Sequence, residues 1–236
     1  MQIKLFKKPK NVTIVTGFPG FGLVGTIATE FLLDHLHTEQ IGKIWMNELP
    51  AMIAVHEGRL VEPLGIFYHK EKNLVIVHGV TAVKGLEWKI ADAVMKIAEE
   101  LAAHEILCLE GVGSLQQKKD PDIFYFANNK ETKSMLKKAD CKDLNEGIIM
   151  GVTGSILIRA DKLDKACIFA ETHSNLPDSN AAAKVVQVLD KYLGLKVDYK
   201  PLIEQASKFE EKLKGMMQRG QEAEKMQQMK NLSYMG

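Results

Sequence analysis

Cysteine, net charge and long apolar runs are all scarce in this chain of 236 residues. The three cysteines, Cys108, Cys141 and Cys167, are scattered, and none belongs to a Cys-x-x-Cys pair. Neither a disulfide framework nor a zinc knuckle is therefore indicated, and we expect a reducing, cytoplasmic environment and no metal. No apolar run reaches the length of a membrane span, and the first residues do not resemble a signal peptide.

An excess of charge of one sign is also lacking. The formal net charge is +1 although 26% of the residues are charged, so no overall field attracts nucleic acid or an acidic membrane. The short basic stretch Lys7–Lys10 is not interleaved with aromatic residues. We therefore expect neither nucleic acid nor a membrane as a partner.

Glycine, in contrast, is concentrated in one informative segment, Thr16–Gly25, which follows an apolar run. The spacing of Gly20, Gly22 and Gly25 at an expected strand-to-helix turn fits a dinucleotide-binding loop. Glu48 lies roughly twenty residues further on, where such a site has an acidic residue for the ribose. One interpretation of the chain is therefore a nucleotide-binding enzyme.

The same loop also fits close packing of polypeptide against polypeptide, which is the interpretation we favour. Phe18, Pro19 and Phe21 make the loop apolar for a phosphate cradle, and Pro19 lacks an N–H donor. No Lys-Ser or Lys-Thr pair follows the glycines, which excludes a P-loop. The loop residues concerned are Gly17, Phe18, Pro19, Gly20, Gly22 and Gly25.

Apolar runs alternate with helical patterns along most of the chain, which is typical of an α/β sheet with crossover helices. The expected strands are 12–16, 41–46, 52–56, 65–69, 74–80, 105–109, 123–126, 147–150 and 166–171. Among them, 52–56 and 65–69 suggest a hairpin-rich excursion, 123–126 an edge strand and 147–150 a buried strand. The expected helices are 23–36, 86–103, 132–138, 155–161 and 179–192. Asp178 or Ser179 caps the last helix, and Gly194 closes it.

Four of the expected strands end in loops of small or polar residues. Three loops, 17–25, 111–113 and 151–154, are rich in glycine, and the fourth is 171–175. Ligands of open α/β sheets bind beyond the carboxyl ends of the strands, so we expect these loops to share one rim. Tight connections alone would also select small residues there. The rim candidates are Glu110, Gly111, Gly113, Ser114, Gly151, Thr153, Gly154, Glu171 and Asp178.

No nucleophile with an evident base stands out in the sequence. Ser155 follows a glycine without the Gly-x-Ser-x-Gly elbow of hydrolases. Glu171, His173 and Asp178 could form an acid–base group near a strand end, but we favour a surface histidine and a helix cap. We therefore expect no catalytic residue and no cofactor.

The chain changes character beyond residue 202. Ala206, Phe209, Leu213 and Met216 alternate spacings of three and four, which is typical of a coiled-coil seam. So narrow a seam favours packing against a neighbouring subunit, and folding back on the same domain is the alternative. We expect a core domain at 1–198, an oligomerisation helix at 199–230 and a flexible tail at 231–236.

Several short motifs follow one another in a specific order. They are Gly17–Gly25, Glu48–Pro50, Gly111–Gly113, Gly151–Gly154, Glu171–Thr172, Leu176–Asp178 and Ala181–Ala182. Together they resemble the archaeal form of the proteasome assembly chaperone 2 family. The resemblance extends from about Val12 to Tyr199 and is far more specific than a single glycine loop.

The resemblance implies a three-layer α/β/α sandwich related to nucleoside phosphorylases, with a long C-terminal helix. It also implies a homo-oligomer, such as a tetramer, that acts as a chaperone or scaffold on the α subunits of the proteasome core particle. Some members have been labelled ATP-grasp-like, but we find neither a paired set of lysines nor a metal-binding acidic pair here. The rival interpretation remains an ATP-grasp-like or dinucleotide-dependent enzyme that binds a nucleotide or nucleoside with its glycine-rich loops.

Some archaeal relatives have a C-terminal tail of the form hydrophobic–Tyr–X, which inserts into pockets between α subunits. In this chain Tyr234 is third from the end instead of second, and Ser233 precedes it. The aromatic ring is thus displaced from the carboxylate by roughly 3.3 Å in an extended chain. The tail either docks in this way or remains a disordered terminus. The docking candidates are Leu232, Tyr234, Met235 and Gly236.

Overall fold

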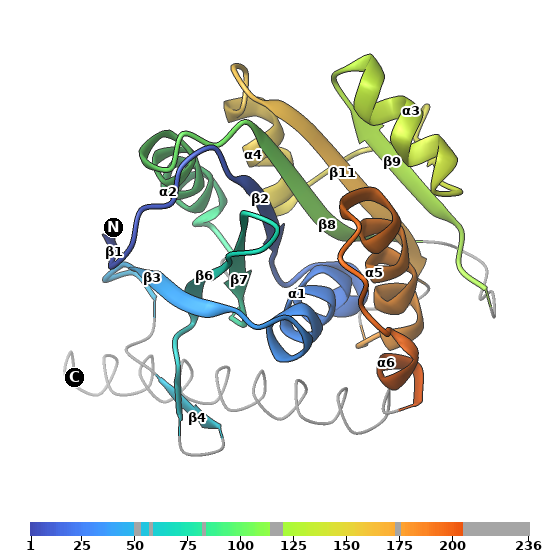
Figure 1. Cartoon of the computed structure of the whole chain (residues 1–236). Helices are drawn as coiled ribbons and strands as arrows, with labels where there is room; N and C mark the ends of the chain where they lie inside the picture. Colours follow the sequence, from blue (N-terminus) through green and yellow to red (C-terminus); the bar gives the residue numbers. More distant parts are fainter. Residues whose placement is uncertain (50–52, 57–58, 82–83, 114–119, 173–175, 205–236) are drawn as a thin grey trace, which may run out of the picture.

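The computed structural model describes residues 1–49, 53–56, 59–81, 84–113, 120–172 and 176–204, and Figure 1 shows their arrangement. The strands are β1 Gln2–Leu5, β2 Thr13–Gly17, β3 Glu39–Trp45, β4 Ala54–His56, β5 Arg59–Val61, β6 Leu64–His69, β7 Leu74–Gly79, β8 Glu105–Gly113, β9 Ile123–Ala127, β10 Lys142–Asp143 and β11 Asp164–Thr172. The α-helices are α1 Val24–His35, α2 Glu87–Glu100, α3 Lys130–Lys138, α4 Gly151–Arg159, α5 Ser179–Leu193 and α6 Lys200–Glu204. A short 3₁₀ turn, η1 Phe21–Leu23, precedes α1.

One mixed sheet organises the described part of the chain, in the order β1-β3-β6-β7-β2-β8-β11-β9-β10. Its four central strands, β7, β2, β8 and β11, are parallel to one another. Every residue of β2 and β7 is buried, as expected for parallel strands with both faces covered. The carboxyl ends of these four strands therefore meet at one edge of the sheet.

Helices cover both faces of the sheet (Figure 1). On one face, α1 and α5 pack side by side, with Ile27 and Val186 in the same core cluster. On the other face, α2 and α4 contribute Ile90 and Ile156 to a second cluster. The arrangement is a three-layer α/β/α sandwich, and the α/β class expected from the sequence is confirmed.

The cap predicted for α5 is confirmed. The Asp178 carboxylate accepts a hydrogen bond from the Ala181 N–H at 3.0 Å, which satisfies one free donor of the first turn. Gly194 ends the helix in the left-handed conformation, with φ of 62°. The cap residue Asp178 and the terminal Gly194 thus mark the two ends of this helix, as predicted.

The prediction of a buried strand at 147–150 is wrong. These residues form no strand, and Ile148 and Met150 are 88% and 70% exposed. A short apolar run of this kind fits a buried strand as well as an exposed loop, because periodicity needs more residues to distinguish them. Here the run leads directly into α4, so the glycines at 151–154 begin a helix and do not end a strand.

Other boundaries also differ from the expectation. Strand β8 continues through 110–113, which we expected to be loop, because it pairs with β11 as far as Thr172. Strand β9 is not at an edge, since β10 pairs with its outer side. The segments 52–56 and 65–69, expected together in a hairpin-rich excursion, belong to different sheets: β4 pairs with β5, which was not expected, and β6 joins the main sheet between β3 and β7. Strand β1 was not expected at all.

The expected seam of Ala206, Phe209, Leu213 and Met216 and the expected tail from Asn231 lie outside the described residues. The last described element is α6, which packs against α5 and buries Leu202. Within the part of the chain that is described, no helix is long and apolar enough to cross a membrane.

Candidate functional site

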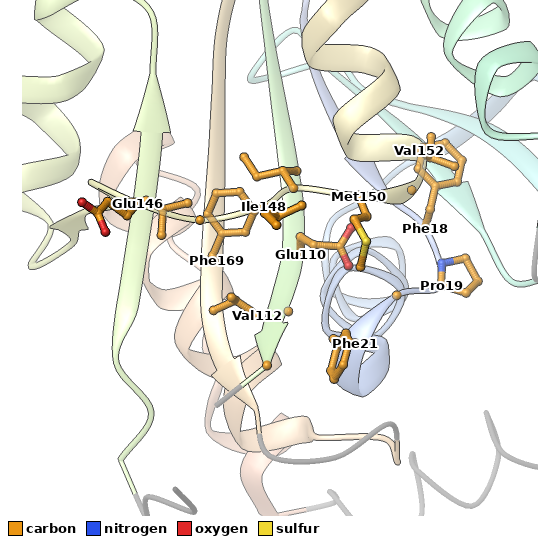
Figure 2. A pocket seen from close by; sticks show the side chains of 17 residues that line it. Phe18, Pro19, Phe21, Glu110, Val112, Glu146, Ile148, Met150, Val152 and Phe169 are labelled. Atoms are coloured by element: carbon orange, nitrogen blue, oxygen red, sulfur yellow. The ribbon is translucent and has the colours of Figure 1, made fainter. Parts of the chain in front are cut away.

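A pocket opens at the edge where the parallel strands end. It has a volume of about 480 Å³ and lies between the loop after β2, the end of β8 and the segment 144–152 (Figure 2). Volumes of this size are typical of small-molecule sites, and this edge is where open α/β sheets bind ligands. The pocket is therefore the candidate functional site of the described chain.

Glu110 is the chemically distinctive residue of the pocket. It lies in β8, and its Oε2 accepts a hydrogen bond from the Thr153 hydroxyl of α4 at 2.9 Å. Burial raises the pKa of the Glu110 carboxyl to about 7, against the hydrogen bonds from the Thr153 hydroxyl and the Gly111 N–H, which lower it. The carboxyl group is consequently divided between its neutral and charged forms near neutral pH.

The other pocket walls are mostly apolar. Phe18 and Phe21 line one side, and Phe169, Val112 and Met150 are among the residues that close the rest. Among the described residues that line the pocket, the charged side chains are Glu110 and Glu146, and none is lysine, arginine or histidine. In Figure 2 the Glu146 side chain lies well apart from that of Glu110. The pocket is thus apolar with an acidic character.

The glycine-rich loop is packed tightly against the sheet. A Cβ atom at Gly17 would lie 2.2 Å from the carbonyl oxygen of Gly25, and one at Gly25 would lie 2.2 Å from that of Leu109. A Cβ atom at Gly111 would lie 2.1 Å from the carbonyl oxygen of Phe21. These distances are too short for any side chain, so the glycines allow α1 and its turn to approach β2 and β8.

Gly20 and Gly22 connect the loop to β8 and to the start of α5. A Cβ atom at Gly20 would lie 1.8 Å from Oε1 of Glu110, so the absent side chain leaves space for the carboxylate. Gly22 has a φ of 60° and its carbonyl oxygen accepts a hydrogen bond from the Asp178 N–H at 2.9 Å. Asp178 also accepts a hydrogen bond from the Thr172 hydroxyl at 2.9 Å. The loop is therefore attached both to β8 and to the start of α5.

A buried polar cluster lies beneath this loop and was not anticipated. His78 of β7 contacts Glu30 of α1 through Nε2 and Oε2 at 2.9 Å, and its Nδ1 lies 2.8 Å from the Thr29 hydroxyl. The order carboxylate–imidazole–hydroxyl resembles a catalytic relay. Thr29 is fully buried, however, and does not line the pocket, so the cluster fastens α1 to the sheet.

The structure brings together many, but not all, of the sequence-predicted residues. Thr153 contacts Glu110, whereas Gly17, Gly22, Gly25, Gly154, Glu171 and Asp178 do not line the pocket. Ser114 and His173 lie outside the described residues. Predicted residues that line the pocket are Phe18, Pro19, Gly20, Glu110, Gly111, Gly113 and Gly151.

Sequence reasoning missed the segment 144–150, because its apolar run was assigned to the core. The only signal that could have placed it at the surface is its position directly before the glycines of α4. This segment supplies Ile148 and Met150 to the pocket, and both are largely exposed.

The sheet order argues against a Rossmann dinucleotide site. In that fold, the strand that leads to the ribose-binding acid lies next to the first strand of the motif. Here β3, which precedes Glu48, is separated from β2 by β6 and β7. The Glu48 carboxylate forms an ion pair with Lys89 of α2. No group of three or more metal-ligating side chains occurs in the described part of the chain.

The fold and the site thus define a class of protein: an α/β/α sandwich whose glycine-rich loop is packed against the sheet and whose strand ends border an apolar, acidic pocket. The chain belongs to the PAC2 family, whose sequence model matches residues 14–217. The family resemblance inferred from the motifs is therefore confirmed.

Two solved structures and one further sequence illustrate the similarity. Pyrococcus furiosus PbaA, an archaeal homolog of proteasome-assembly chaperone, has a TM-score of 0.85 and 30% identity, over 94% of this chain and 100% of that one. An uncharacterized protein of Methanocaldococcus jannaschii is 26% identical over 230 residues, covering 90% of this chain and 89% of its own. Pyrococcus furiosus PbaB, an archaeal proteasome activator, shares the fold, with a TM-score of 0.76 and 21% identity over 91% of this chain and 98% of that one.

Proposed function

We propose that the protein is a chaperone or scaffold for proteasome assembly and not an enzyme. The observation that carries this proposal is the similarity to PbaA, a homolog of proteasome-assembly chaperone, at 30% identity over 94% of this chain. The site is consistent with such a role, because the glycine-rich loop is filled by polypeptide, and the Thr153 hydroxyl that donates to Glu110 is buried and does not line the pocket.

The partner that we propose is the ring of α subunits of the proteasome core particle. The contact would be made by the tail residues Leu232, Tyr234, Met235 and Gly236. A terminal carboxylate next to an aromatic anchor is an established mode of peptide recognition. A homo-oligomer presents several tails at once, and this raises their effective concentration at the ring.

The homo-oligomer itself is the second element of the proposal. The seam of Ala206, Phe209, Leu213 and Met216 would hold the subunits together, as a tetramer for example. The proposal retains the division into a core domain at 1–198, a long helix at 199–230 and a tail at 231–236. It also retains a relationship of the sandwich to nucleoside phosphorylases.

Removal of residues 231–236 tests the tail. We expect the truncated protein to lose binding to isolated α rings in gel filtration, while its own mass in light scattering stays unchanged. Ser233→Ala serves as the matched control and should bind as the full chain does. Binding that survives the truncation would refute the tail contact.

Truncation after Glu204 tests the seam. This cut retains α6, whose Leu202 is buried against the core, so the core should remain folded. We expect a fall in mass by light scattering to that of a smaller particle. An unchanged mass would show that the subunits associate through another surface.

The rival enzyme hypothesis predicts binding of ATP, NAD or nucleosides at the strand ends. The pocket argues against nucleotides, since its described lining has two carboxylates and no basic side chain to receive phosphates. We therefore expect none of these compounds to raise the melting temperature in a thermal-shift screen. Stabilisation by a nucleotide that Gly22→Val abolishes would support the enzyme instead.

A further inference from the structure

The strand-end pocket combines one carboxyl group of raised pKa with apolar, partly aromatic walls. Oε2 of Glu110 accepts a hydrogen bond from Thr153, and Oε1 lies against Gly20, in the space that a Cβ atom there would need. Phe18, Phe21 and Phe169 also line the cavity. A carboxylate can pair with a cation, and the faces of phenylalanine rings attract cations as well.

The charged side chains that line the pocket determine whether it would bind a cation or an anion. Glu110 and Glu146 are acidic, and the described lining contains no lysine, arginine or histidine. Among the described lining residues an anion would meet like charges and no counter-charge, whereas an organic cation would find a partner at Glu110. The apolar walls favour a cation that also has an apolar body.

We propose that this pocket binds a small organic ammonium ion, with its nitrogen at the Glu110 carboxylate and its apolar body against the apolar wall that includes the half-exposed Phe21. The volume of about 480 Å³ fits a free small molecule. The Thr153 hydroxyl and the Gly111 N–H donate to the carboxylate, and the ammonium N–H group would add a charge-assisted hydrogen bond where Glu110 lines the cavity. This site is separate from the proposed C-terminal contact with the α ring.

Binding is coupled to the ionisation of Glu110. Its pKa of about 7 means that an ammonium ligand must displace a proton from part of the molecules at neutral pH. The titratable groups around it are Glu146 of the pocket wall and Cys167 of β11, whose pKa is raised by burial and which stays neutral. The contacts from α4 and from the loop after β2 are made by Thr153 and Gly20, which do not titrate.

Calorimetric titration of the full chain with three compounds of similar shape tests the proposal. The probes are 2-phenylethylammonium, the neutral 2-phenylethanol and the anionic phenylacetate. We expect the ammonium ion to bind at least about tenfold more tightly than the alcohol, as for a charge-assisted hydrogen bond, and phenylacetate not to bind. Equal affinities for the ammonium ion and the alcohol would overturn the proposal.

Two substitutions locate the contact. Glu110→Gln retains the shape and the acceptor for Thr153 but removes the charge, so it should weaken ammonium binding about tenfold or more. Glu146→Gln makes the same chemical change at a residue far from Glu110 and should alter affinity by less than about twofold, since exposed charges interact weakly. Equal effects of the two substitutions would show a diffuse acidic surface instead of a site.

A measurement on the unaltered protein guards against misfolding of the variants. Affinity for 2-phenylethylammonium should rise about tenfold between pH 6 and pH 8, as Glu110 loses its proton. Titrations at pH 7 in buffers of different ionisation enthalpy should reveal about half a proton released per ligand. Binding that is independent of pH with no proton release contradicts the assignment to Glu110.

A fourth compound tests whether the ammonium group belongs to a free small molecule or to a lysine side chain of a polypeptide. Nα-acetyl-lysine amide presents the same cation on a polypeptide side chain. We expect it to bind more weakly than 2-phenylethylammonium, because its amide groups fit the phenylalanine-lined walls poorly. Tighter binding of the lysine compound would overturn the assignment to a free small molecule in favour of a protein side chain.

Discussion

The two sides of the Glu110 side chain are built in opposite ways. On one side, the loop after β2 touches the sheet so closely that Gly25 and Gly111 have no room for a Cβ atom. On the other side, the segment before α4 leaves a cavity and exposes 88% of Ile148 and 70% of Met150. Backbone fills the side of the loop after β2. The side of the segment before α4 retains a cavity although its residues are bulky.

This contrast shows that a glycine-rich motif indicates close backbone packing and not the ligand site itself. Glycine spacing identifies where two backbones touch, and the absence of side chains there makes the structure denser. The space for a ligand arises next to the motif, where apolar residues line the strand ends without filling them. The glycine-rich motif therefore lies next to the candidate site, and Glu110 contacts the motif at Gly20 and also lines the pocket.

The largest effect is expected for Gly25→Ala on the packed side. The new methyl group would lie 2.2 Å from the Leu109 carbonyl oxygen, so α1 must move away from β8. We expect a loss of about 3–5 kcal/mol in the free energy of unfolding, or failure to fold, measured by denaturant titration.

Gly147→Ala on the open side is the matched control. Its Cβ atom would make only ordinary contacts with Leu144, at 3.5 Å or more, and its φ is not positive. The cost should be within about 0.5 kcal/mol. Similar losses for Gly25→Ala and Gly147→Ala would remove the distinction between the two sides.

An intermediate effect is expected for Glu110→Gln, at the boundary of the two sides. The ordinary pKa of 4.5 is raised to about 7 in the folded protein, which therefore holds this proton more tightly than the unfolded chain does. The stabilising contribution of the neutral carboxyl is present below pH 4.5 and is lost as the pH rises to about 7. Glu110→Gln lacks this loss, so it should be more stable than the wild type at pH 8 by up to about 3 kcal/mol.

The difference between variant and wild type should shrink as the pH falls to 5, and denaturant titrations at both pH values measure it. Glu146→Gln, at the exposed end of the pocket, should follow the wild type at both. A constant difference between Glu110→Gln and the wild type would show that Glu110 is ionised like a surface residue.

The sequence predicted the parts of the fold that depend on long patterns. Strand β7 is an unbroken apolar run because helices cover both of its faces, and α5 has a cap, a repeating apolar face and a terminal glycine. The α/β class follows from such segments. Strand β8 was cut short because glycines at 111 and 113 weaken a strand pattern, whereas pairing with β11 extends it.

The candidate site could be predicted only in part. Glu110 and the glycines around it were found because they follow an apolar strand. Thr153 was found as a rim residue, but its hydrogen bond to Glu110 depends on the packing of α4 against the sheet. The pocket wall at 144–150 was missed, since four apolar residues have the same composition whether buried or exposed.

The smallest effect is expected for Ile148→Ser on the open side. Ile148 is 88% exposed, so the substitution removes little buried apolar surface and should change the free energy of unfolding by less than about 0.5 kcal/mol. Ile156→Ser, a few residues further on in α4, is the matched control. Its side chain is fully buried, and we expect a loss of about 3–5 kcal/mol.

The stability losses of Ile148→Ser and Ile156→Ser together show whether the segment before α4 is exposed to solvent in solution. A loss above about 1 kcal/mol for Ile148→Ser would mean that another polypeptide covers the segment when the protein folds. A second copy of this chain would then make that loss depend on protein concentration, because association stabilises the folded state by mass action. A small loss that is the same at all concentrations would leave the pocket accessible to a small ligand, as its apolar and acidic lining suggests.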